Sequence, residues 1–285
     1  MNNICLKIAV AMIAGIGLFT TNAIATTRTV DCDKGQTIQA AVERGQGSAG
    51  QLYIDVSGYC DEVVTIKRDD VSIDGENNDT VKGFLVQAGM RISIRSLTVT
   101  EPGVGIYVVR GDIELTDVDV TGNVDFGLLL NNGSDAAVEE STISGNDIGI
   151  SVRNGSNVIV NGSDILSNTS TGIETDNGTS VVVYNISAIS GNTGGGIDAD
   201  LHSSVVIRDS SVTNNGNYGI KLQSDSGLRI DPNVIVSGNG VAGEFCSSTA
   251  SCGVFCGDTE SSVLDLSDID DVVECTDFTQ VSPTP

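Results

Sequence analysis

Hydrophobic and polar residues alternate along most of this chain in short stretches that each follow a glycine. The stretches read GIYVV, GLLLN, GISVR, GIETD, GIDAD and GIKLQ, and a second alternating run such as SVVVYNISAI comes after them. An alternation with a period of two predicts β-strands rather than helices. Val and Ile dominate one set of positions, as expected for strands. The pattern therefore predicts an all-β protein.

The alternating stretches recur at a nearly constant interval. The leading glycines lie 22 to 24 residues apart, and each repeat ends in a turn with an asparagine. The glycines are Gly83, Gly105, Gly127, Gly149, Gly172, Gly196 and Gly219, and the asparagines are Asn123, Asn146, Asn168, Asn192, Asn215 and Asn239. A short strand cannot bury its apolar face alone, whereas parallel coils stacked at about 4.8 Å bury a continuous core. We therefore predict a solenoid of about eight to nine coils, with a ladder of asparagines at a turn where Asn tolerates left-handed backbone.

This glycine-led repeat with its asparagine turn resembles the right-handed parallel β-helix family, the pectate-lyase-like superfamily. The resemblance covers roughly residues 30 to 243 and implies a right-handed, single-stranded parallel β-helix. The family includes polysaccharide lyases, glycoside hydrolases, uronate epimerases and non-catalytic surface proteins, so the resemblance leaves the activity open. It also implies a short N-terminal capping helix, which fits Ile38, Ala41 and Val42 because these residues share one helical face.

The first 25 residues have the pattern of a secretory signal peptide. Lys7 precedes an apolar run from Ile8 to Phe19, and Ala23-Ile24-Ala25 has the small-x-small form of a signal-peptidase site. The run is too short to span a bilayer, and no later segment could do so. We expect a secreted or periplasmic protein with a signal peptide at 1–25, an N-terminal cap at 26–50, β-helix repeats at 51–243, and a cysteine-containing C-terminal cap and tail at 244–285.

Export makes disulfides the expected state of the cysteines that follow the signal peptide. These are Cys32, Cys60, Cys246, Cys252, Cys256 and Cys275, and six cysteines allow fifteen pairings. We expect Cys32 to pair with Cys60 and the four late cysteines to pair among themselves. A zinc site is the alternative, but the late spacings are not the short paired gaps of such sites, and the only histidine, His202, is distant in sequence.

Charge and composition exclude several functions. The chain has 14 Lys and Arg against 38 Asp and Glu, for a net charge of -24. It therefore lacks the cations that neutralise phosphates, which excludes a nucleic-acid binder or an anionic-membrane binder. Trp is absent and aromatic residues make up 4%, so a platform for stacking bases is not expected. The chain has no nucleophile elbow, phosphate-binding loop, zincin helix or dinucleotide fingerprint.

The repeat alignment gathers acidic side chains on two adjacent coils. After each glycine the first residue points inward and the next outward. The first outward positions are Tyr107, Leu129, Ser151, Glu174, Asp198 and Lys221, and the second are Val109, Asn131, Arg153, Asp176, Asp200 and Gln223. Four carboxylates, flanked by Arg153 and Lys221, are thus predicted to share one face, with His202 one outward step further. Stacking places Glu174 about 4.8 Å from Asp198 at the backbone.

Carboxylates this close repel one another unless one is protonated or a cation is shared. One interpretation is the acid–base site of a carbohydrate enzyme; its catalytic residues would be Glu174, Asp198, Asp200, His202, Arg153 and Lys221. Another is a calcium site; its ligands would be Glu174, Asp176, Asp198 and Asp200. A third is a merely solvated acidic face. The family's catalytic signatures do not decide among them, since the polygalacturonase, pectate-lyase and epimerase motifs are missing, and Asp198-Ala199-Asp200-Leu201-His202 is only a loose echo of the epimerase motif.

Two functions from different classes are therefore compatible with the sequence. The favoured one is a secreted, non-catalytic structural, surface or binding module, whose partner is a polysaccharide or another cell-surface component. The alternative is a secreted carbohydrate-active enzyme of the polysaccharide lyase, glycoside hydrolase or uronate epimerase type. The missing Trp, the short coils and the negative charge favour the first, because an anionic polymer would be repelled unless calcium bridged it.

Overall fold

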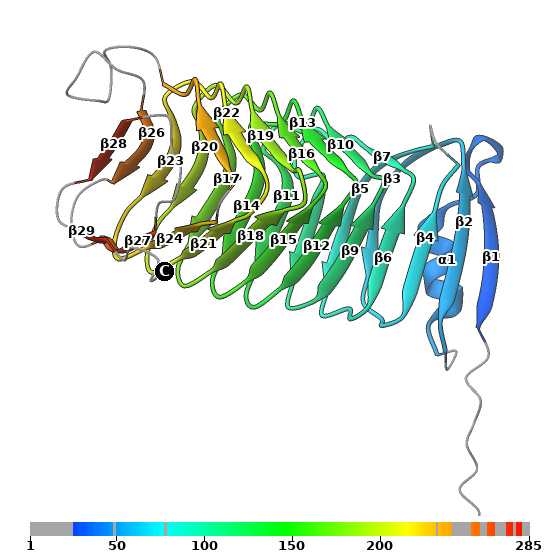
Figure 1. Ribbon diagram of the computed structural model, residues 1–285. Coiled ribbons are helices and arrows are strands. Elements are labelled where there is room, and N and C mark those ends of the chain that lie inside the picture. The colour runs from blue at the N-terminus through cyan, green and yellow to red at the C-terminus, as the bar shows by residue number, and fades with distance from the viewer. Residues whose placement is uncertain are drawn as a thin grey trace, which may run out of the picture.

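The computed structural model shows a parallel β-solenoid of about nine turns that are stacked along one axis (Figure 1). It describes residues 25–47, 50–76, 79–231 and 233–240, together with the backbone of four strands beyond residue 250. Successive coils pair strand by strand, and all of the pairings are parallel, for example β14 with β17 and β17 with β20. The predicted fold class is confirmed.

Each coil contributes strands to two sheets. Sheet A consists of β1 (Thr26–Asp31), β2 (Leu52–Ser57), β4 (Val71–Asp74), β6 (Ile92–Arg95), β9 (Asp112–Thr116), β12 (Asp135–Glu139), β15 (Asn157–Asn161), β18 (Ser180–Tyr184), β21 (Ser204–Ile207), β24 (Gly227–Ile230), β27 (Ser261–Asp265) and β29 (Phe278–Gln280). The long row of sheet B consists of β3 (Tyr59–Ile66), β5 (Thr80–Gln87), β8 (Ile106–Val109), β11 (Phe126–Asn131), β14 (Ile148–Arg153), β17 (Thr171–Asp176), β20 (Gly195–Ala199), β23 (Tyr218–Leu222), β26 (Cys252–Cys256) and β28 (Val272–Cys275). Its short row consists of β7 (Thr98–Val99), β10 (Asp119–Thr121), β13 (Thr142–Ser144), β16 (Asp164–Leu166), β19 (Ala188–Ser190), β22 (Ser211–Thr213) and β25 (Ile235–Ser237).

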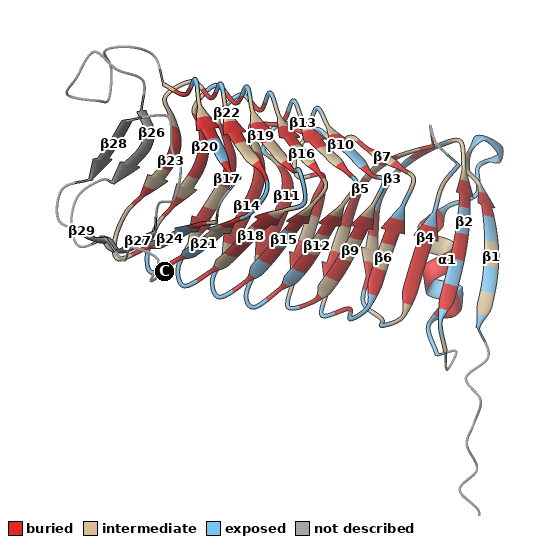
Figure 2. Ribbon diagram, viewed as in Figure 1, coloured by how far each residue is buried: buried red, intermediate tan, exposed pale blue. Residues whose placement is uncertain are grey.

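The inward side chains of the sheets form one continuous apolar core, which Figure 2 shows as buried segments along successive coils. Ile150, Ile173 and Ile197 are in register on β14, β17 and β20, and each is completely buried. A fully buried side chain of this size contributes about 1.5 to 3 kcal/mol relative to an exposed one. The inward positions predicted from the alternation are therefore confirmed, and they stabilise each coil through its neighbours.

A short helix covers the N-terminal end of this core. Helix α1 (Ile38–Gly45) follows the 3-10 turn η1 (Cys32–Lys34). On the face of this helix that covers the core, Ile38, Ala41 and Val42 are fully buried. The hydroxyl of Thr37 caps the helix by accepting from the N–H of Ala40 at 3.2 Å. The carboxylate of Glu62 on β3 accepts the N–H groups of Ile38 and Gln39 at 2.6 and 3.0 Å. The predicted capping helix is confirmed.

A disulfide joins Cys32 to Cys60 and so ties η1 to β3. The residues it links are 28 positions apart in sequence. This pairing confirms the expectation for the first two cysteines. It fastens the cap, which contacts β1, β2 and β3, directly to the sheet beneath it.

The asparagines form the predicted ladder along the turn between the short and long rows. The backbone N–H and the Nδ2 of Asn146 donate to Oδ1 of Asn168 at 3.0 and 3.1 Å, and Nδ2 also donates to the carbonyl of Val120 at 3.2 Å. All six asparagines are buried, and the pattern repeats from Asn123 to Asn239. Each buried amide is thereby satisfied by the adjoining coils, which is the condition for burying it without a large penalty.

The expectation that the asparagines themselves adopt left-handed backbone is wrong. The left-handed residue is the one before each asparagine: Gly145 precedes Asn146 with a φ of 64°, and Ser167 precedes Asn168 with a φ of 53°. The asparagine side chain points into the solenoid to reach the neighbouring coils. The chain reversal must therefore be made by the preceding residue, which several coils fill with glycine.

Two predictions fall outside the described residues. The signal peptide at 1–25 lies in the N-terminal part that the structure does not describe, except for Ala25, and so does the side-chain chemistry of Cys246, Cys252, Cys256 and Cys275 in the C-terminal cap. The backbone strands β26 and β28 continue the long row, and β27 and β29 continue sheet A. The pairing of the late cysteines and the domain boundaries stay predictions. Within the described residues, no helix has the length and apolarity needed to cross a membrane.

Candidate functional site

The outward face of the long row carries the predicted ladder of side chains. Glu174 on β17 is in register with Ser151 on one side and with Asp198 on the other, and Asp198 is in register with Lys221. Arg153 is in register with Asp176. The alternation therefore predicted correctly that Glu174 lies beside Asp198 and Arg153 beside Asp176. Ser151, which it predicted to point outward, is buried, and the pairing of β17 with β20 ends at Thr175 and Ala199, before Asp176 and Asp200.

Asp198 accepts hydrogen bonds on both carboxylate oxygens. Its Oδ1 accepts from Nε2 of Gln223 at 3.0 Å. Its Oδ2 accepts from the hydroxyl of Tyr218 at 3.1 Å and from Nζ of Lys221 at 3.2 Å. All three donors come from the next coil. They compensate the charge of the carboxylate and fix its orientation, as charge-assisted hydrogen bonds do.

Tyr218 is a member of this network that the alternation does not mark, because it precedes the leading glycine instead of following it. Its ring lies over Gly195, where a Cβ atom would come within 2.1 Å of the ring. Burial, followed by the charge of Asp198, raises the pKa of the Tyr218 hydroxyl, so this group remains a hydrogen-bond donor at neutral pH. The signal in the sequence is an aromatic residue that faces a glycine one coil earlier.

Glu174 is half-buried and paired with a cation. Nη2 of Arg153 lies 3.3 Å from its Oε1. Burial raises the pKa of the Glu174 carboxyl above its usual value; Arg153 opposes this shift, and the charges of Asp198 and Asp176 add to it. Arg153 is itself fixed, since its guanidinium lies 4.9 Å from the ring centre of Phe126 and its Nε donates to Ser151 at 2.9 Å.

The other two predicted carboxylates lie differently: Asp176 is near enough to Glu174 for its charge to raise the pKa of that carboxyl, whereas Asp200 lies in a turn. Asp200 follows the end of β20, and its Oδ1 accepts from the N–H of Leu201 at 2.8 Å, within its own turn. In the described part of the chain, three or more potential ligand atoms come within 4.8 Å of one another only at Cys32, Cys60 and Glu62. The carboxylate oxygens of the predicted calcium ligands therefore do not converge in this structure.

His202 lies in the turn after β20 rather than on the strand line. Its backbone is left-handed, with a φ of 63°. Its Nε2 lies 3.5 Å from Oδ2 of Asp225, and 72% of its side chain is exposed. The structure therefore pairs this histidine with a neighbouring turn and not with the four carboxylates.

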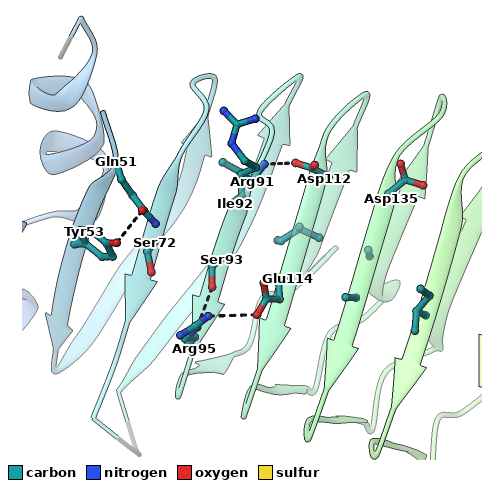
Figure 3. A pocket seen from close by; sticks show the side chains of 14 residues that line it. Gln51, Tyr53, Ser72, Arg91, Ile92, Ser93, Arg95, Asp112, Glu114 and Asp135 are labelled. Carbon is teal, nitrogen blue, oxygen red and sulfur yellow. Dashed lines mark hydrogen bonds and ion pairs between the residues drawn. The ribbon is translucent and has the colours of Figure 1, made fainter. Parts of the chain in front are cut away.

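A hollow of about 520 Å³ lies on a different face of the solenoid, on the outer side of sheet A (Figure 3). It crosses β2, β4, β6, β9, β12 and β15. The lining residues are Gln51, Tyr53, Ser72, Arg91, Ile92, Ser93, Arg95, Asp112, Ile113, Glu114, Asp135, Ala136, Ala137 and Ile159. None of them belongs to the predicted site.

The family of the protein follows from its repeat region. Residues 82–241 match the family described as "Right handed beta helix region". This match covers more than half of the chain, and the protein belongs to this family of right-handed β-helices. No curated protein matches the chain in sequence.

Solved structures share the fold at low sequence identity. The pectate lyase Pel9A has a TM-score of 0.59 and 14% identity, over 90% of this chain and 79% of that chain. The A-module of the mannuronan C-5 epimerase AlgE6 of Azotobacter vinelandii has a TM-score of 0.52 and 12% identity, over 92% and 89%. The alginate lyase from Paenibacillus sp. str. FPU-7 has a TM-score of 0.50 and 10% identity, over 81% and 98%. Identities this low establish a common fold, and the predicted resemblance is confirmed at that level.

Proposed function

We propose that this chain is a secreted, non-catalytic binding module for polysaccharide, and that the face of the long row around Glu174 and Asp198 contacts the sugar chain. One observation carries the proposal: both oxygens of Asp198 are already occupied by donors of the next coil. A general base must reach a substrate proton with a free lone pair. Three of the about four lone-pair positions of this carboxylate are engaged by these donors, so the group is better suited to hold its neighbours in place than to abstract a proton.

The composition of this face supports a hydroxyl-rich ligand. Arg153 and Lys221 lie over the rings of Phe126 and Tyr218, and together with Gln223 they place nitrogen donors beside the carboxylates of Glu174 and Asp198. Few, well-placed polar groups next to apolar surface are typical of small-molecule and sugar sites. The names of the structural relatives, a pectate lyase, an epimerase and an alginate lyase, support the same class of ligand. The net charge of -24 favours a neutral polysaccharide over an anionic one.

The test is retention of the protein in native gels that contain one polysaccharide each, neutral or anionic. We expect retardation by a neutral polysaccharide. We expect Asp198→Asn combined with Lys221→Ala to weaken it several-fold, because the charged carboxylate that accepts from Tyr218, Lys221 and Gln223 is removed together with one of these donors. Glu139→Gln on sheet A is the matched control for a lost acidic charge. Formation of new chain ends in any polysaccharide would show that the protein is an enzyme and would overturn the non-catalytic assignment.

Glycoside hydrolysis is the second candidate, and the raised pKa of Glu174 favours it. Burial that raises the pKa of a carboxyl group makes that group a better general acid than an exposed carboxyl group would be. In that case wild type would release reducing ends, whereas Glu174→Gln would bind the polysaccharide and release none. Equal rates for the two proteins would exclude this role for Glu174.

Calcium and export belong to the same proposal and need their own measurements. Calcium would have to draw Glu174, Asp176, Asp198 and Asp200 together, so its binding would raise the melting temperature of wild type and not that of Asp198→Asn with Asp200→Asn. Equal curves with calcium and with chelator would remove calcium from the proposal.

Export predicts a mature N-terminus at Thr26, which N-terminal sequencing of the secreted protein checks.

A further inference from the structure

We propose that the hollow in sheet A is a second binding site, independent of the long row, which holds a neutral sugar chain along the solenoid axis. The inference rests on the proposed function only for the class of ligand. The site itself rests on the shape and chemistry of sheet A, to which the Glu174–Asp198 network contributes no residue.

The floor of the hollow is built from the small side chains of Ser72, Ser93 and Ala137, together with Glu114, between two larger apolar ones. On the outer side of sheet A, one line of residues in register runs from Tyr53 through Ser72, Ser93, Glu114 and Ala137 to Ile159. This line crosses five strand spacings, or about 24 Å. Tyr53 and Ile159 stand at its two ends and are 37% and 41% exposed. The shape is an open trough that fits an extended chain lying across the strands.

Two arginines line the trough with donors whose orientation is fixed. Arg95 is the last residue of β6, and Arg91 directly precedes that strand. Arg91 is held by Asp70, with Nε and Nη2 at 2.6 and 2.8 Å from the two carboxylate oxygens. Arg95 donates through Nε to Ser93 at 3.0 Å and through Nη2 to Glu114 at 3.3 Å. Figure 3 shows these groups around the floor, with Asp112 and Asp135 on the strands that follow. Pre-oriented donors and acceptors reduce the entropy that a ligand must lose on binding.

The charge of the trough is nearly balanced. Its lining holds Arg91 and Arg95 against Asp112, Glu114 and Asp135, whereas the whole chain carries -24. The lining thus combines N–H donors with carboxylate acceptors, and this combination suits hydroxyl groups, which donate and accept at once. An anionic polymer would gain little here, because each guanidinium already has a carboxylate partner. The ligand class is therefore a neutral polysaccharide.

Two sites on different sheets make the protein bivalent. Sheet A and the long row form separate faces of the solenoid (Figure 1), so one sugar chain cannot lie on both faces in an extended form. Each protein molecule would then bridge two polysaccharide chains, and the second contact would be strengthened by the high local concentration of polymer. The function that follows is cross-linking of a sugar matrix.

The test blocks the floor of the trough without touching the core. Ala137→Arg raises a large side chain from the floor, and Val182→Arg places the same side chain on the same line of sheet A, on β18 beyond the lining. Calorimetric titration with hexasaccharides of glucose, xylose and mannose should give two sites per wild-type molecule and two for Val182→Arg. Ala137→Arg should keep one site and lose the other, with affinity there reduced at least about tenfold. The melting temperatures of the two variants show whether both fold equally well.

The two proposals fail in different ways. The second site is overturned if Ala137→Arg binds every hexasaccharide as wild type does, or if wild type binds none of them. The long-row site is overturned if Asp198→Asn with Lys221→Ala binds as wild type does while Ala137→Arg binds nothing. The trough is then the sugar-binding site. Turbidity on mixing with a soluble neutral polysaccharide should appear for wild type and Val182→Arg and should be lost in Ala137→Arg.

Discussion

The first coils, from β1 to β8, and the regular coils, from β9 to β25, hold the same fold through different contacts. The first coils depend on individual contacts between distant residues: the Cys32–Cys60 disulfide, Glu62 at the start of α1, and Arg68, whose guanidinium donates to the carbonyls of Gly45 and Gly50. The regular coils repeat one set of contacts at every step. Asparagines pair at one turn, and serines such as Ser141 and Ser163 pair at another, at 3.0 Å.

This difference predicts how far along the solenoid the loss of one contact lowers stability. A contact made once, such as the disulfide, protects only the elements it joins. A contact that every coil makes with the next one links the free energy of each coil to that of its neighbours. Loss of one such contact should therefore loosen the coils on both sides. Four predictions test this comparison.

The largest effect is expected from Ile173→Asp in the regular coils. The new carboxylate would be buried between Ile150 and Ile197 with no partner, so the variant should lose more than about 4 kcal/mol of unfolding free energy. Urea denaturation measures the loss. Ser180→Asp, an outward position on β18, should change stability by less than about 0.5 kcal/mol. An unaltered denaturation midpoint for Ile173→Asp would mean that this position does not face the core.

Removal of the disulfide by Cys32→Ser with Cys60→Ser tests the first coils. The closed loop spans 28 residues, and its release should lower stability by about 2 to 4 kcal/mol. Hydrogen exchange should become faster in α1 and β1 and stay unchanged from β9 onward. Faster exchange throughout the solenoid would contradict the local character of this contact.

Substitution of one asparagine of the ladder tests the regular coils. Asn168→Ala removes the acceptor of Asn146 and the donor to Asn192, and the buried groups left without partners should cost about 1 to 3 kcal/mol. Exchange should become faster in the coils on both sides of the substitution. Asn157→Ala is the control, because its side chain donates to Asp135 on the exposed face of sheet A. Protection lost only at residue 168 would show that the coils are not coupled through the ladder.

The smallest effect concerns the pH dependence that Glu174 introduces. Its folded-state pKa is raised, so the folded state binds the proton more tightly than the unfolded state does. Stability should therefore fall as pH rises from the ordinary glutamate value to the raised one, and should stay level above it. Glu174→Gln should remove this slope and change stability by less than about 1 kcal/mol. Denaturation of both proteins across this range measures it, and parallel curves would show that Glu174 does not titrate there.

The regular coils could be predicted from the sequence because their period places every residue. The alternation after each glycine identified Ile173 as inward and Glu174 as the neighbour of Asp198 without knowledge of the structure. Tyr218 and the trough could not be found in this way. Tyr218 reaches Asp198 across Gly195 from the position before the leading glycine, where the simple alternation does not hold. The trough depends on the relative sizes of side chains on neighbouring coils, which a period does not encode.

The asparagine ladder also determines how the length of this protein can change. Each asparagine bonds only to the coil before and the coil after it, and the turn geometry around it is the same at each level. A coil can therefore be removed or duplicated as a whole, and the free ends of the ladder will meet again in register. A change of one or two residues in the same place leaves an amide without its partner. Whole coils are therefore the units in which the ladder can be lengthened or shortened, whereas the intervals of 22 to 24 residues between the leading glycines show that a coil can gain a residue elsewhere. Each coil added within the trough would extend it by one strand spacing.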